Sequence, residues 1–375
     1  MFEENLFLLI LFSLFSITGI IQLFYYLYYY LVVILYKHPD VKSVKEPVSV
    51  IICARDEAGN LASFLPSVLK QDYPDYEVIV VNDCSEDNSY DILCDFQGQY
   101  PHLRISNVTK DSKFTHTKKF AQFIGIKAAK NDILVFTDAD CQPESDKWLK
   151  TIASRFNKNI DVILGYGGHF KRKGLLNKYI RYDSMTIGLQ YLGMAIRGVP
   201  YMGVGRNLAY KRSLFFERKG FGTFSHVVSG DDDLFVNSNA DRNNTTAEFR
   251  REAHTRSVPP ASFGEWIKQK KRHMSTARYY NPGDKFRLIT EPFTRVLFYV
   301  SFVILLSDLF LWHYVVAIFG LRLIIQTIVI SLTQKRLNER GIEVFSLFFD
   351  IFSPVINSAI YISNIFTRPA KNTWK

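Results

Sequence analysis

The sequence predicts an α/β domain with a mostly parallel sheet, flanked on both sides by membrane-spanning helices. Short β-branched runs alternate with helical patterns between residues 37 and 295, as in sheets whose parallel strands are joined by crossover helices. Apolar stretches long enough to cross a bilayer lie on either side of this region, and the C-terminal ones are interrupted by a few charged residues. The 375 residues are 47% hydrophobic with a formal net charge of +10, which excludes a disordered chain and suits a protein that meets anionic lipids or phosphorylated substrates.

The first membrane helix is predicted in residues 6–36, where 31 successive positions carry no charge. About 20 apolar residues suffice to cross a bilayer as a helix. A cleaved signal peptide is disfavoured because the short leader is acidic and no small-residue cleavage site follows. Basic residues follow the run at Lys37, Lys42 and Lys45, so the positive-inside rule places the N-terminus outside and the bulk of the chain in the cytoplasm.

Two further spans are predicted between about residues 296 and 332, joined by a tight turn near Trp312. A third apolar segment, 344–366, ends in the basic tail 368–375. Spanning would place this tail outside, against the charge bias, so we expect an interfacial or re-entrant helix in preference to a full span. The expected domains are an N-terminal membrane helix in 1–36, a cytosolic domain in 46–290 and a C-terminal membrane domain in 292–375.

Five strands and four helices are predicted in the cytosolic domain. The strands are short apolar runs bounded by polar turns, at residues 48–54, 77–82, 103–108, 133–137 and 162–164. The helices between them are expected at 61–71, 89–99, 118–129 and 146–156. Ligands bind such sheets at the carboxyl ends of the strands, so residues that directly follow the strands are candidates for the functional site.

Acidic residues follow two of the predicted strands. Asp83 follows the second strand, and Asp138 and Asp140 follow the fourth. Alternate residues share a face at a strand end, so Asp138, Asp140 and Gln142 can converge and offer oxygen ligands to Mg²⁺ or Mn²⁺. A solvated turn is the ordinary explanation of an Asp-x-Asp pair, but its position after a buried strand favours a metal site. No glycine-rich dinucleotide loop or Walker lysine loop is found, which disfavours a dinucleotide cofactor and P-loop chemistry.

A further acidic cluster, Asp231, Asp232 and Asp233, directly precedes a helical pattern. Acidic residues at a helix start satisfy free backbone N–H groups, and this capping role is the simpler explanation. Three adjacent acids repel one another, however. We therefore expect that the cluster lies beside a cation, or that one of its carboxylates acts as a base whose pKa is raised by the neighbouring acids.

Two groups of basic residues, at 118–119 and at 268–273, are further candidates for the site. The run at 268–273 is by default a solvated or membrane-facing charge run, but cations opposite an acidic metal site also suit a departing diphosphate. Lys118 and Lys119 open a predicted helix, and they either contact phosphates or are solvated.

A glycine-containing turn and an apolar helix are the last candidate elements. The turn MGVGRN either lines an acceptor cleft or serves as a tight turn near the membrane. Its candidate residues are Gly205, Arg206 and Asn207. The helical pattern at 176–196 is expected to lie on the membrane surface, in slight preference to closing the core.

Five segments together resemble the membrane-anchored family 2 glycosyltransferases of bacteria. They are VSVIICARDEAGNL, EVIVVNDCSEDNS, KKFAQFIGIKAAKNDILVFTDADC, GDDDLF and QKKRH, in that family's order and spacing over roughly residues 46–280. The flanking spans and PYMGVGRNLAYKRSLFF are similar to those of polytopic Bacteroidetes-type members. The resemblance implies a GT-A fold, a divalent ion, a nucleotide-diphosphate sugar donor and inversion at the anomeric carbon.

Together with the reasoning above, the resemblance implies a role for each candidate residue. The residues expected around the nucleotide are Ala54, Glu57, Asp83, Asp138 and Lys119, with Asp83 accepting the uracil N3–H. The expected metal ligands are Asp138, Asp140 and Gln142. The residues expected near the diphosphate and acceptor are Asp231, Gln269, Arg272, His273, Gly205, Arg206 and Asn207. Asp232 is the expected general base, and His273 stands where the family usually has tryptophan, which leaves aromatic stacking on the acceptor in doubt.

The expected function is inverting, metal-dependent transfer of a sugar from a nucleotide-diphosphate sugar to a lipid-linked or glycan acceptor at the bacterial inner membrane. A UDP-sugar is favoured, and a GDP-sugar remains open. One alternative is a processive polysaccharide synthase that extrudes its product. The other is a catalytically silent nucleotide-sugar-binding membrane scaffold. Nucleic-acid binding is disfavoured because the basic residues lack the interleaved aromatics of a recognised module.

Overall fold

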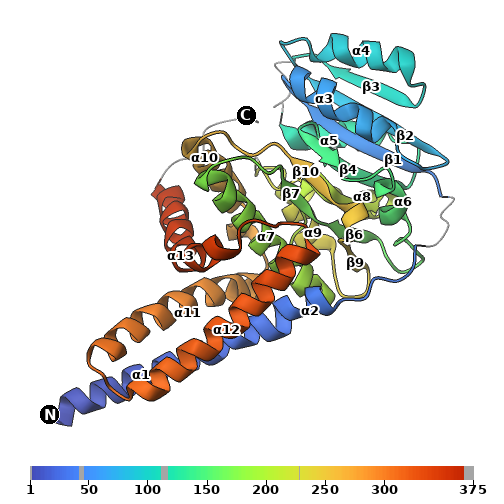
Figure 1. Cartoon of the computed structure of the whole chain (residues 1–375). Coiled ribbons are helices and arrows are strands. Elements are labelled where there is room, and N and C mark those ends of the chain that lie inside the picture. Colours follow the sequence, from blue (N-terminus) through green and yellow to red (C-terminus); the bar gives the residue numbers. More distant parts are fainter. Residues whose placement is uncertain (1, 42–45, 111–116, 228, 367–375) are drawn as a thin grey trace.

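The computed structural model describes residues 2–41, 46–110, 117–227 and 229–366. Lys42, Lys45 and the basic tail 368–375, on which part of the topology prediction depends, lie outside these ranges. Figure 1 shows a globular α/β part from which three long helices project together, with the N-terminus at their far end.

A seven-stranded sheet with the order β3-β2-β1-β4-β8-β6-β9 forms the centre of the globular part. Its strands are β1 Val48–Ala54, β2 Tyr76–Asp83, β3 Leu103–Val108, β4 Ile133–Asp138, β6 Val162–Gly165, β8 Leu208–Lys211 and β9 Thr245–Glu248. The first four are parallel, whereas β8 is antiparallel to both β4 and β6. The predicted α/β class with a mostly parallel sheet is confirmed.

Helices cover both faces of this sheet. On one face, α3 Ala58–Leu69, α4 Ser89–Gln99 and α6 Trp148–Ala153 pack against Val50 and Ile52 of β1. On the other face, α5 Lys118–Ala128 packs against Ile51. Successive strand residues point to opposite faces, so a run of consecutive apolar residues in β1 supplies both cores.

A smaller three-stranded sheet with the order β5-β10-β7 continues from the end of β4. Its strands are β5 Cys141–Pro143, β7 Gly167–His169 and β10 Thr255–Ser257. β10 is antiparallel to β5 and parallel to β7. Because β5 begins three residues after β4 ends, this sheet fixes the chain that directly follows the Asp138 and Asp140 segment.

Helix α7, Leu175–Ile196, does not lie on a membrane surface. Fourteen of its 22 residues are buried, and it contacts β7 and β9 on one side and α2 and α13 on the other. The preference for a membrane-surface helix is therefore wrong, and this segment closes the core. A helix that is apolar on most sides is buried by protein on most sides. The shorter helices of this region are α8 Arg212–Glu217, α9 Asp233–Asn239 and α10 Phe263–Met274.

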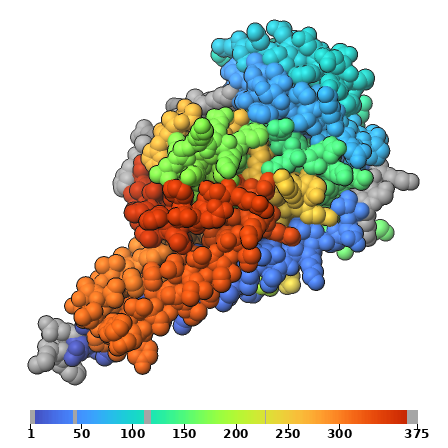
Figure 2. Space-filling view, in the orientation of Figure 1, coloured from blue at the N-terminus to red at the C-terminus, as the bar shows by residue number. Residues whose placement is uncertain are grey.

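Four of the described helical segments are long and apolar enough to cross a membrane. They are the continuous helix of α1 Phe2–Phe24, the π-helical turn Tyr25–Tyr30 and α2 Leu31–Leu35, then α11 Pro282–Ser307, α12 Trp312–Arg336 and α13 Glu343–Phe366. α1, α11 and α12 run side by side (Figure 1). α13 contacts α7 and α10, and Figure 2 shows the red C-terminal residues between the orange helices and the globular part. Its interfacial orientation stays a prediction.

Candidate active site

The candidate site lies at the carboxyl end of β4. Asp138 ends this strand and Asp140 lies in the turn that follows. Three possible ligand atoms lie within 4.8 Å of one another: a carboxylate oxygen of Asp138, a carboxylate oxygen of Asp140 and the sulfur of Cys141. Burial and the nearby Asp138 charge raise the pKa of Asp140 to about 6. A divalent cation would relieve this repulsion, so the carboxylate pair fits a metal ion.

The two carboxylates are better metal ligands than their neighbours in the chain. Burial raises the pKa of the Cys141 thiol well above its ordinary value, and the thiol donates to Asp140 Oδ1 at 3.3 Å. Mg²⁺ and Mn²⁺ prefer oxygen ligands to sulfur. Gln142 pairs in register with Arg256 of β10 and lines a neighbouring cavity. The described residues thus bring Asp138 and Asp140 together and place Gln142 at the wall next to them.

Lys118 joins the two groups of acids. It lies in the first turn of α5, where the Thr117 side chain caps the helix by accepting from the Phe120 amide. The Lys118 ammonium donates to Asp138 Oδ1 at 2.7 Å and lies 3.5 Å from Asp231 Oδ2. Burial opposes its charge, but Asp138 and Asp231 outweigh burial and raise the pKa of Lys118. Burial likewise opposes ionisation of Asp138, and the Lys118 cation outweighs it and lowers the pKa of that carboxyl.

Lys119 points away from these acids. Its buried ammonium donates to the carbonyl oxygens of Phe224 at 2.8 Å and Val227 at 2.6 Å, and burial lowers its pKa to about 8. Adjacent helix residues are about 100° apart around the axis, so the two lysines face different surroundings. Lys118 therefore lies beside the acids, whereas Lys119 contacts backbone carbonyls, and a contact of either lysine with a nucleotide stays a prediction.

Asp232 is the partly exposed member of the second acidic cluster. Its Oδ1 accepts from the Asp233 amide at 2.8 Å and its Oδ2 accepts from the Gly205 amide at 2.6 Å. It therefore caps α9 and faces the site at the same time. Asp233 is buried and accepts from the hydroxyls of Tyr280 and Thr276; burial and the Asp232 charge raise its pKa to about 7.

The turn Gly205–Asn207 packs against these acids. A Cβ on Gly205 would lie 3.2 Å from Asp232 Oδ2 and 3.5 Å from Lys118 Nζ, so glycine permits this close approach. Arg206 donates to His169 Nε2 at 3.3 Å and Ser257 Oγ at 3.2 Å. Asn207 is fully buried, and its amide donates to backbone carbonyls at 2.8 and 2.7 Å. Asn207 therefore supports the fold behind the site and does not reach an acceptor.

The residues expected around the nucleoside lie at the same sheet edge. Ala54 ends β1 and Asp83 ends the neighbouring strand β2. Asp83 is fully buried and forms an ion pair with Arg55. Glu57 precedes α3, and its amide donates to Ser89 Oγ at 2.9 Å. Arg55 was not among the residues expected at the site, although a basic residue directly after a strand was the available signal.

Helix α10 divides its basic residues between two roles. Lys270 is buried and donates to both carboxylate oxygens of Asp183 in α7, at 2.7 and 2.6 Å. Arg272 and His273 are exposed and Gln269 is partly exposed. Arg272 also lowers the pKa of Asp138, after the larger effects of burial, Lys118 and Arg206. α10 is thus fixed to the core by Lys270 and directs the charge of Arg272 towards the β4 carboxylates.

The sheet region is similar to known glycosyltransferases. Residues 49–217 match the family described as Glycosyl transferase family 2. The chain is 30% identical over 191 residues to the glycosyltransferase AglE of Haloferax volcanii, covering 49% of this chain and 58% of that protein. It is 30% identical over 101 residues to the poly-beta-1,6-N-acetyl-D-glucosamine synthase of Staphylococcus epidermidis, covering 27% of this chain and 23% of that protein. The matched regions thus span little more than half of the first relative and about a quarter of the second.

A solved structure shares the fold over almost the whole chain. It is the mannosyltransferase PcManGT of Pyrobaculum calidifontis in complex with GDP-Man and Mn²⁺, with a TM-score of 0.58. The alignment covers 94% of this chain and 99% of that one at 17% identity, so the likeness concerns the fold alone. Residues 49–217 are therefore similar to family 2 glycosyltransferases, and they belong to a GT-A-like α/β domain that is flanked by candidate membrane helices.

Proposed function

We propose that this chain transfers a sugar from a nucleotide-diphosphate sugar to a membrane-associated acceptor, with inversion at the anomeric carbon. The observation that carries the proposal is the position of Lys118 between Asp138 of β4 and Asp231 of the second acidic cluster. Acids more than ninety residues apart in the chain thereby meet at one site. Ligands bind at this edge of α/β sheets.

Asp138 and Asp140 are the residues that hold a divalent ion in this proposal. Mn²⁺ or Mg²⁺ bound there supplies the positive charge that stabilises a leaving diphosphate. Arg206 and Arg272 add positive charge on the side of the acids that faces the small sheet and α10. The Mn²⁺ in the complex of the P. calidifontis enzyme supports this assignment.

Asp232 removes the proton from the acceptor hydroxyl as the sugar is transferred. Its two backbone hydrogen bonds, from Gly205 and Asp233, fix the orientation of the carboxylate. Inverting transfer needs one such base and no covalent nucleophile. Asp231 and Asp233 are buried and engaged with Lys118, Thr276 and Tyr280, which leaves Asp232 as the carboxylate that an acceptor can reach.

Asp83 bears on the base of the nucleotide donor, and the long apolar helices bear on the location of the protein. Asp83 lies at the carboxyl edge expected to meet the base, and a carboxylate that accepts the N3–H favours uridine over guanosine. Four candidate spans and the basic residue Lys37 after the first of them favour a multi-pass protein with its enzyme domain in the cytosol. We assign it on this basis to a bacterial inner membrane and to a lipid-linked glycan acceptor.

Asp232→Asn tests the base directly. Asparagine also caps helices well, so the variant is expected to fold and to bind UDP or GDP with Mn²⁺ as the unchanged protein does. Turnover is expected to fall by roughly 10²–10⁴-fold, the usual contribution of a general base. The measurement is nucleoside diphosphate release from a panel of UDP- and GDP-sugars with Mn²⁺ or Mg²⁺. Asp95→Asn, an exposed carboxylate on α4, is the matched control. Undiminished turnover in Asp232→Asn would remove the assignment of the base.

The length of the product separates single transfer from processive synthesis. The similarity to a polysaccharide synthase over 101 residues keeps the second possibility relevant. Purified protein given donor and acceptor is expected to yield a product longer by one sugar. A ladder of long polymer would support the synthase instead, and donor binding without any turnover would support the silent scaffold.

A further inference from the structure

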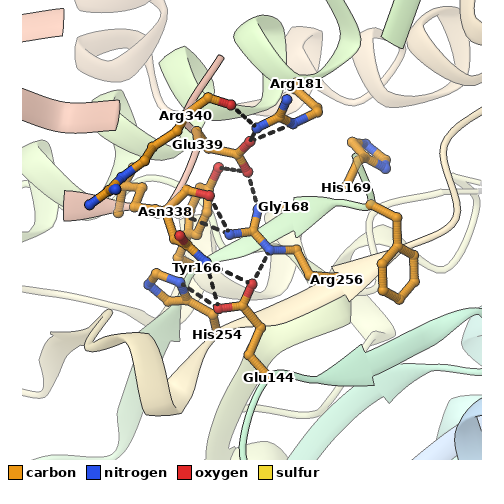
Figure 3. A network of polar contacts seen from close by, with 12 residues as sticks. Glu144, Tyr166, Gly168, His169, Arg181, His254, Arg256, Asn338, Glu339 and Arg340 are labelled. Atoms are coloured by element: carbon orange, nitrogen blue, oxygen red, sulfur yellow. Dashed lines mark hydrogen bonds and ion pairs between the residues drawn. The ribbon is translucent and has the colours of Figure 1, made fainter. Parts of the chain in front are cut away.

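A cavity lies beside the candidate active site, next to the segment that joins α12 to α13. Its volume is about 470 Å³. It lies where the small sheet and the start of the loop before α7 meet the segment that joins α12 to α13. Figure 3 shows some of the side chains around it, among them those of Glu144, Arg181, Arg256 and Arg340. Lysine and arginine predominate among its charged lining residues, which are Glu144, Lys171, Arg181, Arg256 and Arg340.

Two of these cations are already neutralised. Arg256 donates to Glu144 Oε1 at 2.6 Å and forms an ion pair with Glu339. Arg181 donates to Glu339 Oε2 at 2.8 Å and to the Arg340 carbonyl at 3.0 Å. Glu339 is fully buried behind the cavity. These contacts, drawn in Figure 3, fix the α12–α13 segment to β10 and α7 and form a rigid floor.

The other two cations are exposed at the edge of the cavity. Among the described residues, no hydrogen bond or ion pair joins the Lys171 ammonium or the Arg340 guanidinium to an acid. Arg172 and Lys173 continue the basic run after Lys171. Glu343 at the start of α13 is the nearby acid, and its carboxylate accepts from the Gly341 amide. The cavity therefore carries a positive charge that its own carboxylates do not balance.

Two residues that line the cavity are neighbours of the site proposed for sugar transfer. His169 lines it and accepts from Arg206, the neighbour of Gly205, whose amide holds the Asp232 carboxylate. Gln142 lines it from the other side, two residues after Asp140. The segment with Arg340 joins two candidate membrane spans, so the cavity faces the level at which lipid phosphates lie.

We propose that this cavity binds the terminal phosphate of a lipid that carries or constitutes the acceptor, with Lys171 and Arg340 as the groups that contact it. Lysine and arginine are the side chains that hold phosphate oxygens, and arginine does so with two parallel hydrogen bonds. The paired Arg181 and Arg256 form the floor and leave room for one anionic group. The inference rests on the proposed transfer function and names the chemistry of its acceptor.

The test measures binding of farnesyl monophosphate to the full chain in an uncharged detergent by calorimetry. The double variant Lys171→Ala/Arg340→Ala is expected to weaken binding by at least about tenfold, because charged hydrogen bonds to the phosphate are lost. Farnesol, which lacks the phosphate, is expected to bind weakly and equally to both proteins. Lys171→Arg/Arg340→Lys keeps both charges but loses the two parallel hydrogen bonds of Arg340, so its affinity is expected to lie between those of the unchanged protein and the double alanine variant.

Lys130→Ala/Lys147→Ala is the matched control. It removes two exposed lysines outside the cavity, and is expected to change binding by less than about twofold. Equal affinity of the Lys171/Arg340 double alanine variant and this control for farnesyl monophosphate would overturn the proposal. Phosphatidylglycerol added to the micelles separates the possible sources of the phosphate. If it displaces farnesyl monophosphate at equal concentration, the cavity is a general headgroup site and the acceptor assignment is overturned; if it does not, the monoester assignment is supported.

Nucleotide binding is measured in the same samples. UDP and GDP affinity with Mn²⁺ is expected to be unchanged in all three double variants, because none of the substituted residues contacts the β4 carboxylates. If the unchanged protein binds neither nucleotide, the proposed function fails while the farnesyl monophosphate result still decides the nature of the cavity. If nucleotide binds and the alanine variant still binds farnesyl monophosphate normally, only the cavity assignment fails.

Discussion

Lys118 is the residue on which the arrangement of the candidate site depends. Its ammonium lies between the two groups of acids, which are Asp138 and Asp140 after β4 and Asp231, Asp232 and Asp233 at the start of α9. Its ammonium lowers the pKa of Asp138 more than Arg206 and Arg272 do, whereas burial and the Asp138 charge raise the pKa of Asp140 to about 6. The two carboxylates proposed as metal ligands thus differ because one has a lysine beside it.

Lys118→Met is expected to tighten Mn²⁺ binding to the nucleotide-free protein. A unit charge about 4 Å from another contributes about 4 kcal/mol at an effective dielectric constant of about 20, so removal of this cation should raise the affinity by at least about tenfold. Calorimetric titration of Mn²⁺ measures the effect. Lys119→Met is the control, because its ammonium contacts backbone carbonyls, and its Mn²⁺ affinity should stay within about twofold. Unchanged or weaker Mn²⁺ binding in Lys118→Met would contradict this account of the site.

At the scale of elements, helix α7 determines how the globular part meets the N-terminal helix. Gly193 of α7 lies directly against the backbone of the π-helical turn, and a Cβ at this position would overlap the Tyr29 carbonyl oxygen. The backbone of the turn cannot move aside as a flexible side chain can. The close approach of these two elements therefore requires glycine.

Gly193→Ala is expected to destabilise the protein by about 1–3 kcal/mol or more, the usual effect of forced overpacking. Gly59→Ala in α3 is the matched control, since a Cβ there meets no atom within 4 Å. It is expected to be neutral or to stabilise by up to about 1 kcal/mol through helix propensity. Thermal unfolding of both variants in detergent measures the difference. A melting temperature for Gly193→Ala at or above that of Gly59→Ala would show that the two elements do not pack this closely.

At the scale of the whole molecule, one buried carboxylate joins α13 to two other candidate membrane helices. Asp350 Oδ1 accepts from Arg295 of α11 at 2.9 Å, and Oδ2 accepts from Arg322 of α12 at 2.9 Å. Tyr299 donates to the same carboxylate at 2.7 Å. The side chains of Asp350 and Arg322 are almost fully buried, so the network lies away from solvent.

Asp350→Ala is expected to cost about 3–5 kcal/mol, because it leaves two buried arginines without their shared partner. The melting temperature in detergent measures the loss. Asp308→Ala is the control, since Asp308 is exposed at the end of α11 and its removal should change stability by less than about 0.5 kcal/mol. Equal melting temperatures for the two variants would mean that the network does not hold α13 in place.

The sequence by itself determined the sheet class and much of the strand pattern. The five predicted strands are present because a buried parallel strand is a continuous apolar run that local composition reveals. β8 and the strands of the small sheet are not evident in the sequence. They are three or four residues long and depend on partners far away in the chain, so no local pattern identifies them.

The sequence also placed Asp138, Asp140 and the 231–233 cluster at element ends, because acids after a strand or before a helix are visible as a pattern. Only the tertiary structure decided that Lys118 and not Lys119 joins them, that Asn207 supports the core, and that α7 is buried. The side chains of adjacent helix residues point in different directions, and what each side chain contacts depends on the other elements that pack around the helix. The cavity with Lys171 and Arg340 has the same origin, since it forms between segments about 170 residues apart in the chain.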